Sequence, residues 1–285
     1  KVEWIPYPVK EQIHISEFFS MFKSERDKAY VFPGEAHNFW ECVYVLDGSI
    51  CVSADERVYN MSAGEMIFHK PYELHKYHTT GEKNAKLFIF SYSAEGESSN
   101  YFCDKVFYLT EKQQKTVEIL IDYMQEQLEK LNIKAKNGQE NMFLIPFEKI
   151  PEYSQIVATH IYLLLFSLYN NSEALPVSNS HDSIIFGEAI TYMNKRIYDN
   201  PSVNEISKNV GVSQASLKRI FNKYSGLGVH KYFLKLKLKH ATEMLEKGIS
   251  VTATAEKLGF SSQGYFTKTF QRETGSLPST LCKKL

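Results

Sequence analysis

Residues 203–226 read VNEISKNVGVSQASLKRIFNKYSG, and residues 251–275 read VTATAEKLGFSSQGYFTKTFQRETG. The second stretch repeats the pattern of the first: Gly211 aligns with Gly259 at an offset of 48 residues, and the later positions align at 49. Each stretch predicts a helix, a turn centred on the glycine and a second helix, which together form a helix-turn-helix unit. The glycines are expected to leave the first helix in a left-handed conformation. The C-terminal third of the chain is therefore expected to contain two such units.

The second helix of each unit combines an apolar stripe with a polar face. It is expected to follow a serine cap, Ser213 in the first unit and Ser261 in the second. Leu217, Ile220 and Phe221 recur at the spacing of a buried helix face. The residues left to face outward, or beside that face, are Gln214, Ala215, Lys218, Arg219 and Asn222 in the first unit and Gln263, Gly264, Tyr265, Thr267, Lys268 and Arg272 in the second.

These outward side chains suit the edges of DNA bases. Arginine and lysine donate to guanine, glutamine pairs with adenine, and small residues contact the thymine methyl group. A merely solvated polar face is the alternative for any single amphipathic helix. Charge alone does not decide between the two interpretations: residues 184–285 carry 16 Lys and Arg against 7 Asp and Glu, a net charge of +9, whereas the preceding part carries −9. Two units with matching turns on a part of the chain with this charge weigh against a merely solvated face. Clustered positive charge displaces counterions from phosphates, so double-stranded DNA is the expected partner.

The N-terminal part is expected to form a small β-barrel followed by a helical hairpin. Between residues 30 and 93, short apolar stretches alternate with turn residues, which is typical of an antiparallel barrel or sandwich. Asp47-Gly48 predicts a two-residue hairpin between the strands on either side. Helical spacing follows at 110–131 and about 154–169, and the polar connection between these helices favours an antiparallel hairpin.

On these patterns the C-terminal part resembles the AraC/XylS family of transcription regulators. The matching positions are Ser213, Leu217, Arg219, Phe221, Gly226, Tyr232, Ala241, Leu245, Ala255, Gly259, Phe260, Phe266, Phe270, Gly275 and Pro278. The resemblance covers residues 184–285 and implies two helix-turn-helix units joined by a long helix, here about 230–247. Its two recognition helices would enter successive major-groove segments on one side of the duplex, about 34–36 Å apart.

A degenerate cupin signature lies in the N-terminal part, at Glu35, His37, Glu41 and His75. The complete pattern has a histidine at the position of Glu35 and binds a metal, and a Glu/His/Glu/His set is still able to hold a divalent ion. A cupin barrel fused to AraC-type units nevertheless resembles the effector-binding half of these regulators. We therefore expect the four residues to bind a small-molecule effector, a sugar or another small metabolite, without metal, cofactor or catalytic residue.

Two alternative functions differ from this expectation. One is a cupin metalloenzyme with a DNA-binding tether, which Glu35 at a metal-histidine position disfavours. The other is a fatty-acid-sensing virulence regulator of the same family, which differs only in its effector.

Strand alternation divides the residues near this signature between two faces. Glu41 shares a face with Val43, and Trp40 shares the opposite face with Tyr44. If His37 points inward, Glu41 is expected to do so as well, and Trp40 then faces outward or toward the helices. Trp40 and Tyr44 are suited either to stacking on a sugar ring or to filling the interior.

The expected fold is multidomain, α and β. Its parts are a cupin-like barrel at 1–108, a helical hairpin at 109–175, a linker at 176–183, and an all-α DNA-binding domain at 184–285 with helix-turn-helix units at about 203–224 and 251–273. The second helix of the hairpin is apolar on nearly every side, and the family resemblance tips the expectation to a homodimer, with Leu164 or Phe166 at its contact. RNA polymerase is a further candidate partner.

Several function classes are not expected. The four cysteines form no CxxC pair, which argues against a zinc finger or a disulfide framework. The first residues show no apolar signal region, and the longest apolar stretch, 161–168, is far shorter than a membrane span. No phosphate-binding loop or nucleophile elbow occurs. A cytoplasmic protein that is not an enzyme is expected.

Overall fold

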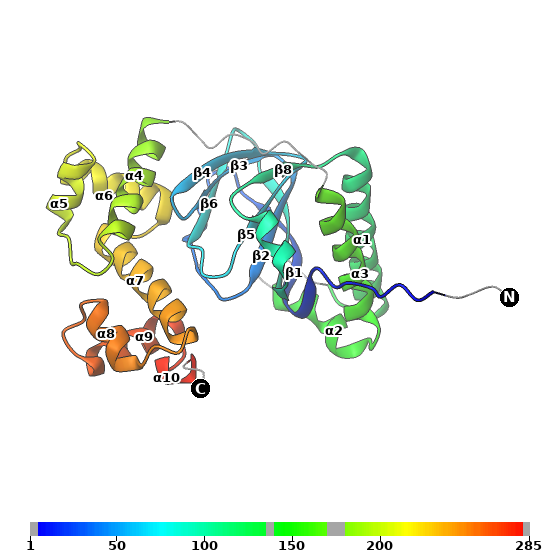
Figure 1. The fold of residues 1–285 in the computed structure, drawn as a ribbon. Coiled ribbons are helices and arrows are strands. Elements are labelled where there is room, and N and C mark those ends of the chain that lie inside the picture. The colour runs from blue at the N-terminus through cyan, green and yellow to red at the C-terminus, as the bar shows by residue number, and fades with distance from the viewer. Residues whose placement is uncertain (1–4, 135–139, 170–179, 282–285) are drawn as a thin grey trace.

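The chain folds into three successive layers, with a β domain between two groups of helices (Figure 1). The computed structural model describes residues 5–134, 140–169 and 180–281. One group of helices belongs to residues 111–168 and the other to residues 181–281. The β domain therefore contacts both groups.

Two antiparallel sheets make up the β domain. The larger has the strand order β1-β7-β2-β5-β8, and the smaller has the order β4-β3-β6. The strands are β1 (His14–Arg26), β2 (Trp40–Asp47), β3 (Ser49–Ala54), β4 (Arg57–Ser62), β5 (Glu65–His69), β6 (His75–Thr80), β7 (Ala85–Glu95) and β8 (Val106–Tyr108), with the short helix η1 (Glu97–Phe102) before β8.

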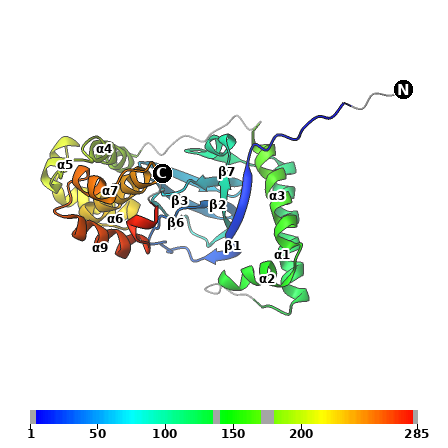
Figure 2. The same ribbon diagram turned by 60° about the horizontal axis from the view of Figure 1, so that its bottom comes forward.

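The first group of helices covers the outer face of the larger sheet (Figure 2). It contains α1 (Glu111–Lys130), η2 (Glu140–Leu144), α2 (Ile145–Lys149) and α3 (Tyr153–Leu168). Thr110 caps α1 in a capping box with Gln113, which satisfies two backbone N–H groups at the start of the helix. Helices α1 and α3 match the predicted hairpin, whereas η2 and α2 were not predicted.

Both faces of the larger sheet are buried. Val43 of β2 packs with Ile50 and other side chains of the smaller sheet. Trp40 and Tyr44, on the opposite face of β2, pack in a second core with α1 and α3. This division confirms the predicted strand alternation, with Glu41 facing the smaller sheet. Trp40 and Tyr44 fill a core, so stacking on a sugar is not their role.

The prediction of a hairpin at Asp47-Gly48 was wrong. Strand β2 pairs with β5 and β7, whereas β3 pairs with β4 and β6. The chain passes from one sheet to the other at Gly48, which has a φ of 81°. A Cβ there would lie 2.6 Å from the carbonyl oxygen of Asn84. The residues of a tight turn indicate a change of direction, but the pairing of the flanking strands depends on the rest of the sheet.

Two strands lie outside the region where strands were predicted. Strand β1 is an edge strand whose side chains are mostly exposed or half-buried, and its pairing with β7 contains two register shifts. Such a strand lacks the strict alternation that sequence analysis uses. Strand β8 has only three residues, too few to show a pattern.

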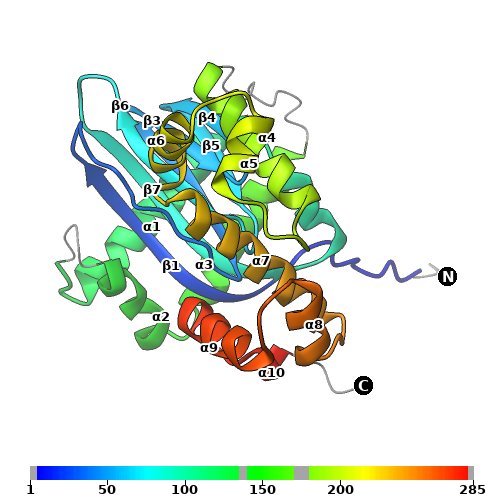
Figure 3. The ribbon, with the colours of Figure 1, turned by 90° about the vertical axis from the view of Figure 1, so that its left-hand side faces the viewer.

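The C-terminal helices contain the two expected helix-turn-helix units. They are α4 (His181–Lys195), α5 (Val203–Asn209), α6 (Gln214–Ser225), α7 (Val229–Glu246), α8 (Val251–Lys257), α9 (Gln263–Thr274) and α10 (Pro278–Leu281). Helix α7 joins the units and runs across one end of the β domain (Figure 3). Gly211 and Gly259 have φ values of 70° and 66°, which confirms the left-handed turns.

One cap in the second unit differs from the prediction. Ser213 caps α6, as predicted, but the cap of α9 is Ser262 and not Ser261. The Ser262 hydroxyl accepts a hydrogen bond from the backbone N–H of Tyr265. The residue that shifts the repeat offset from 48 to 49 lies in this turn and moves the helix start by one position. Most of the predicted linker 176–183 lies outside the described residues, and α4 begins within it at His181.

Candidate functional site

The second helices of the two units, α6 and α9, expose their polar faces. Leu217, Ile220 and Phe221 of α6 are buried in the C-terminal core, as are Phe266 and Phe270 of α9. Of the residues predicted to contact DNA, only Thr267 is half-buried, and the others are exposed: Gln214, Ala215, Lys218, Arg219, Asn222, Gln263, Gly264, Tyr265, Lys268 and Arg272. Their contact with bases or phosphates remains a prediction.

Arg219 already has a carboxylate partner. Its Nη1 and Nη2 atoms donate to Oδ2 and Oδ1 of Asp182 at 2.9 and 3.0 Å, and Lys223 Nζ lies 3.4 Å from the same carboxylate. Hydrogen bonds from Arg219 lower the pKa of Asp182. Asp182 lies in the first turn of α4, 37 residues from Arg219, so sequence analysis gave no signal for the pair.

The polar face of the second unit is held by weaker contacts. Gln263 Oε1 accepts a hydrogen bond from the Thr252 hydroxyl at 3.0 Å. Arg272 Nε donates to Glu273 Oε1 at 3.0 Å. Gln263 lies at the first position of α9, where a recognition helix meets base edges first.

The C-terminal end of α6 lies against the smaller sheet. Ser53 of β3 donates a hydrogen bond to the carbonyl of Tyr224, and Lys76 Nζ of β6 donates to the carbonyl of Asn222 at 2.7 Å. The Tyr224 carbonyl is among those that the end of a helix leaves without a helical partner, whereas the Asn222 carbonyl also accepts from the backbone N–H of Gly226 at 3.1 Å. Gly226 follows directly and approaches Pro33 so closely that a Cβ would lie 2.3 Å from the Pro33 carbonyl oxygen. The recognition helix is thus docked on the β domain.

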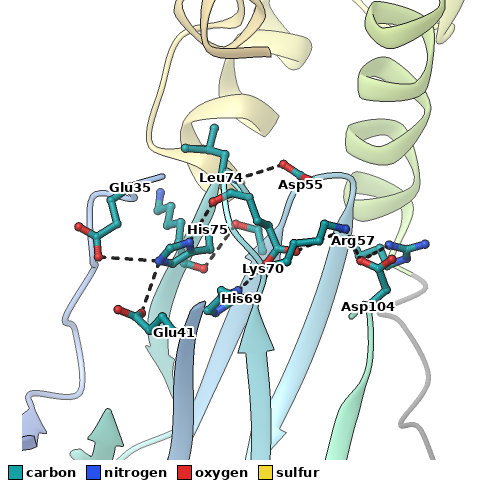
Figure 4. A network of polar contacts seen from close by, with 12 residues as sticks. Glu35, Glu41, Asp55, Arg57, His69, Lys70, Leu74, His75 and Asp104 are labelled. Carbon is teal, nitrogen blue, oxygen red and sulfur yellow. Dashed lines mark hydrogen bonds and ion pairs between the residues drawn. The ribbon is translucent and has the colours of Figure 1, made fainter. Parts of the chain in front are cut away.

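The four residues predicted to bind the effector, Glu35, His37, Glu41 and His75, lie together in the β domain, and Figure 4 shows Glu35, Glu41 and His75 side by side. Their donor atoms are all within 4.8 Å of one another. His75 Nε2 lies 3.4 Å from Glu41 Oε1 and 3.8 Å from Glu35 Oε1, and His37 Nε2 lies 3.8 Å from Glu41 Oε2. Glu41 and His75 are buried, His37 is half-buried and Glu35 is exposed. Such a set of imidazoles and carboxylates is able to hold a small polar ligand or a metal ion.

Backbone pairing brings these residues together across the sequence. Glu35 and His75 form an isolated β-bridge, in which each N–H donates to the other residue's carbonyl at 3.0 Å. Glu41 comes from β2 and His75 from β6, which belong to different sheets. Burial favours the neutral form of His75, but the nearby carboxylates of Glu35 and Glu41 outweigh it and raise the pKa of His75 to about 10. Burial likewise disfavours ionised Glu41, but contacts with His37 and His75 lower its pKa.

Two further side chains, His69 and Glu73, lie beside these four residues. His69 Nδ1 lies 2.6 Å from Glu73 Oε1 in a buried pair. The His69 ring stacks on His75 with 4.2 Å between ring centroids, and burial lowers the pKa of His69. A histidine and a glutamate four residues apart on either side of a turn, with Pro71 between them, were the only signal for this pair.

A cavity of about 300 Å³ lies between the β domain and the C-terminal helices. Its lining residues are Ala36, His37, Asn38, Asp55, Tyr72 and Leu74 from the β domain and Lys235, Leu236, Leu238, Lys239, Thr242, Phe270, Glu273, Thr274, Ser276 and Leu281 from the helices. Lys239 Nζ crosses from one side to the other and lies 2.8 Å from Asp55 Oδ2. Of the four predicted effector residues, only His37 lines this cavity.

Helix α3 has both buried and exposed apolar side chains. Leu164, which was expected at a dimer contact, is 1% exposed and belongs to the core beneath α3. That part of the expectation was wrong, because Leu164 packs within its own chain. Phe166 and Leu163 are 43% and 61% exposed. The number of apolar residues in a helix does not show which of them are buried in the core and which are exposed.

Comparisons with known proteins match both ends of the chain. Residues 20–111 match the family described as AraC-like ligand binding domain, and residues 206–284 match the family described as helix-turn-helix domain. No helix in the described part of the chain is long and apolar enough to cross a membrane.

Three relatives illustrate the similarity. The probable transcription factor PqrA of Proteus vulgaris is 34% identical over 91 residues, which cover 28% of this chain and 75% of the relative. The Msm operon regulatory protein of Streptococcus mutans is 28% identical over 160 residues, so the match spans 53% of this chain and 56% of that protein. The transcriptional activator RhaR of Shigella flexneri is 19% identical over 288 residues, covering 95% and 94% of the two chains.

Proposed function

Because the chain belongs to the AraC family of transcription regulators, we propose that a small-molecule effector, bound between its two parts, controls how its helix-turn-helix units meet DNA. The chain is a DNA-binding regulator with an N-terminal ligand-binding domain and a C-terminal helix-turn-helix domain. The observation that carries the proposal is the cavity between these parts, which both of them line. A molecule held there touches the β domain and helix α7 at once.

The route from the cavity to DNA is short. Helix α7 connects the two helix-turn-helix units, and the β domain holds the end of α6 through Ser53 and Lys76. An effector that favours one spacing of α7 and the β domain shifts the equilibrium toward that spacing by its differential affinity for it. Because the operator half-sites have a fixed separation, such a shift changes how well α6 and α9 fit them together.

The lining of the cavity favours a polar effector. Asp55, Tyr72, Lys235 and Glu273 place charged or hydroxyl groups on opposite sides of it. An alkyl chain would exclude water from these groups, at a cost of about 1–3 kcal/mol for each polar atom that it leaves without a hydrogen-bond partner. We therefore rank a sugar or another small polar metabolite ahead of a fatty acid, and we assign the chain no catalytic step.

A thermal-shift screen of sugars and small polar metabolites on the full chain tests this proposal. A ligand at 100 times its Kd stabilises the folded chain by about 2.7 kcal/mol. Lys235→Ala removes a cavity residue, whereas Lys208→Ala removes an exposed lysine of α5 and serves as the control. A hit should weaken with Lys235→Ala only and should change the Kd for operator DNA. A hit that binds both variants equally, or leaves DNA binding unchanged, contradicts the proposed site.

DNA recognition is proposed to use both α6 and α9, with the exposed residues named above. The ion pair with Asp182 of α4 competes with any contact that Arg219 of α6 makes with a DNA phosphate or base. Asp182→Asn should release Arg219 and steepen the salt dependence of DNA binding by about one counterion. Binding measured over a range of salt concentrations checks this. An unchanged slope means that Arg219 stays away from the DNA backbone.

A homodimer is also proposed, through the exposed side of the helical layer. Phe166 and Leu163 of α3 and Ile119 of α1 are exposed large apolar side chains on this layer, which lies on the far side of the sheet from the helix-turn-helix units (Figure 2). A second copy of the chain would cover them and leave the recognition helices free. Two linked copies gain affinity for a paired operator by avidity. We place the protein in the cytoplasm, where RNA polymerase is a further candidate partner.

A further inference from the structure

We propose that Glu35, His37, Glu41 and His75 bind a divalent first-row transition-metal ion. This site goes beyond the proposed effector control, because the ion can be held whether or not an effector occupies the neighbouring cavity. It differs from the sequence-based expectation of a metal-free pocket. The geometry of the four side chains, which sequence analysis could not provide, carries the difference.

Both histidines aim an unused nitrogen at the carboxylates. His37 Nδ1 bonds to the carbonyl of Phe39 at 2.9 Å, and His75 Nδ1 bonds to the carbonyl of Glu73 at 3.1 Å. A carbonyl only accepts, so each Nδ1 carries a proton, and a bound metal ion would displace any proton from Nε2 and take its lone pair. Both Nε2 atoms are buried and have no hydrogen-bond partner among the described residues. Metal-bound histidines are held in this way, with the second ring nitrogen donating to a carbonyl.

The charge of the cluster calls for a cation. Once both imidazoles are neutral, as metal ligands are, the four side chains carry a net charge of −2, with Glu41 and His75 buried and Glu35 exposed. In the described part of the chain, no lysine or arginine nitrogen lies within 4.0 Å of Glu35 or Glu41, whose ion-pair contacts are with His37 and His75. Buried charges of one sign are costly unless they are paired or coordinate a metal. A divalent ion neutralises the cluster.

The donor spacing matches a shared ion better than direct hydrogen bonds. The nitrogen-to-oxygen distances of 3.4 and 3.8 Å exceed the range of about 2.7–3.2 Å for an N–H donor and an oxygen acceptor. Two ligands about 2.1 Å from a tetrahedral ion lie about 3.4 Å apart. Small side-chain movements therefore suffice to close the site, and exposed Glu35 leaves the ion a route from solvent.

The donor set indicates the class of ion. Imidazole nitrogen suits zinc, iron, copper and nickel, whereas magnesium prefers six oxygen ligands in octahedral geometry. Two nitrogens and two carboxylate oxygens therefore favour zinc and its transition-metal neighbours over magnesium. We choose Zn²⁺ as the probe ion and Co²⁺ as its spectroscopic substitute.

Calorimetric titration of the full, untagged chain with Zn²⁺, after removal of metal by a chelator, tests the proposal. We expect one ion per chain, no saturable binding of Mg²⁺, and a Co²⁺ complex with the intense visible absorption of four-coordinate cobalt. Glu41→Gln and His37→Gln should each weaken Zn²⁺ binding at least tenfold. Circular dichroism without metal shows whether these variants are folded.

His78→Gln is the matched control. His78 lies on β6 three residues after His75, so strand alternation points it to the other face. The Zn²⁺ affinity of the His78→Gln variant should equal that of the unaltered chain. Absence of saturable Zn²⁺ binding, or binding that folded Glu41→Gln and His37→Gln leave unchanged, overturns the site. Because the titration uses neither DNA nor effector, that result would leave the proposed regulatory function standing.

Discussion

Replacing Gly226 with alanine should separate the recognition helix of the first unit from the β domain. Gly226 and Gly275 end α6 and α9 in the left-handed conformation, with φ values of 67° and 77°. A Cβ on Gly226 would lie 2.3 Å from the Pro33 carbonyl oxygen, whereas a Cβ on Gly275 meets nothing within 4 Å among the described residues. The two positions share a backbone conformation and differ in their contact with the β domain, so Gly275→Ala is the matched control.

The expected magnitude follows from these contacts. Alanine in the left-handed region costs about 1–2 kcal/mol at either position. At Gly226 the new methyl group must also move α6 away from the β domain, which breaks the hydrogen bonds from Ser53 and Lys76 to the end of α6. Each such bond contributes about 0.5–1.5 kcal/mol. Gly226→Ala should therefore favour separation by about 1–3 kcal/mol more than Gly275→Ala does.

Cys51 reports this separation directly. It lies on β3, is buried in the core that includes the C-terminal helices, and has a thiol pKa that burial raises to about 11. Opening exposes the thiol and increases its alkylation rate in proportion to the open population. An increase of 1–3 kcal/mol in opening corresponds to about a 5- to 140-fold faster rate. Mass spectrometry of peptides distinguishes Cys51 from the other cysteines. Equal alkylation rates in the two alanine variants would refute the reasoning.

Three further predictions concern the dimer, the DNA contact and the core. Leu163→Glu should shift the chain from dimer to monomer in sedimentation and leave its melting temperature nearly unchanged. Leu164→Glu should instead destabilise the fold by more than about 3 kcal/mol, because it buries a charge. An unaltered chain that sediments as a monomer contradicts the prediction for Leu163→Glu. Gln263→Ala should cost about 1–3 kcal/mol on the cognate operator and relax base preference there; selection of bound sequences from a random pool checks this, and identical selected sequences would mean that Gln263 reads no base. Thr254→Val should raise the free energy of unfolding by about 1 kcal/mol, because the Thr254 hydroxyl is buried without a hydrogen-bond partner among the described residues. Thr242→Val is the control, and thermal melting should show no such gain for it, because the Thr242 hydroxyl donates to the Leu238 carbonyl.

Local features of this protein were readable from its sequence. Gly211 and Gly259 take left-handed φ values because only local sterics decide how a chain leaves a helix. The alternation of Trp40 and Glu41 between two faces holds for the same kind of reason, since successive side chains of any strand point to opposite sides. The helix-turn-helix repeat could be found because its periodicity recurs within the chain.

Contacts between distant residues were decided by the tertiary structure. The chain crosses between sheets at Gly48 because each flanking strand has more distant partners. Asp182 holds Arg219, and Leu164 faces inward while Leu163 faces outward, because packed elements far apart in sequence meet there. A pattern of residue types records the period of an element and the conformation of a turn. Which elements pack together depends on the free energy of burying their faces and pairing their polar groups, and that is a property of the whole fold.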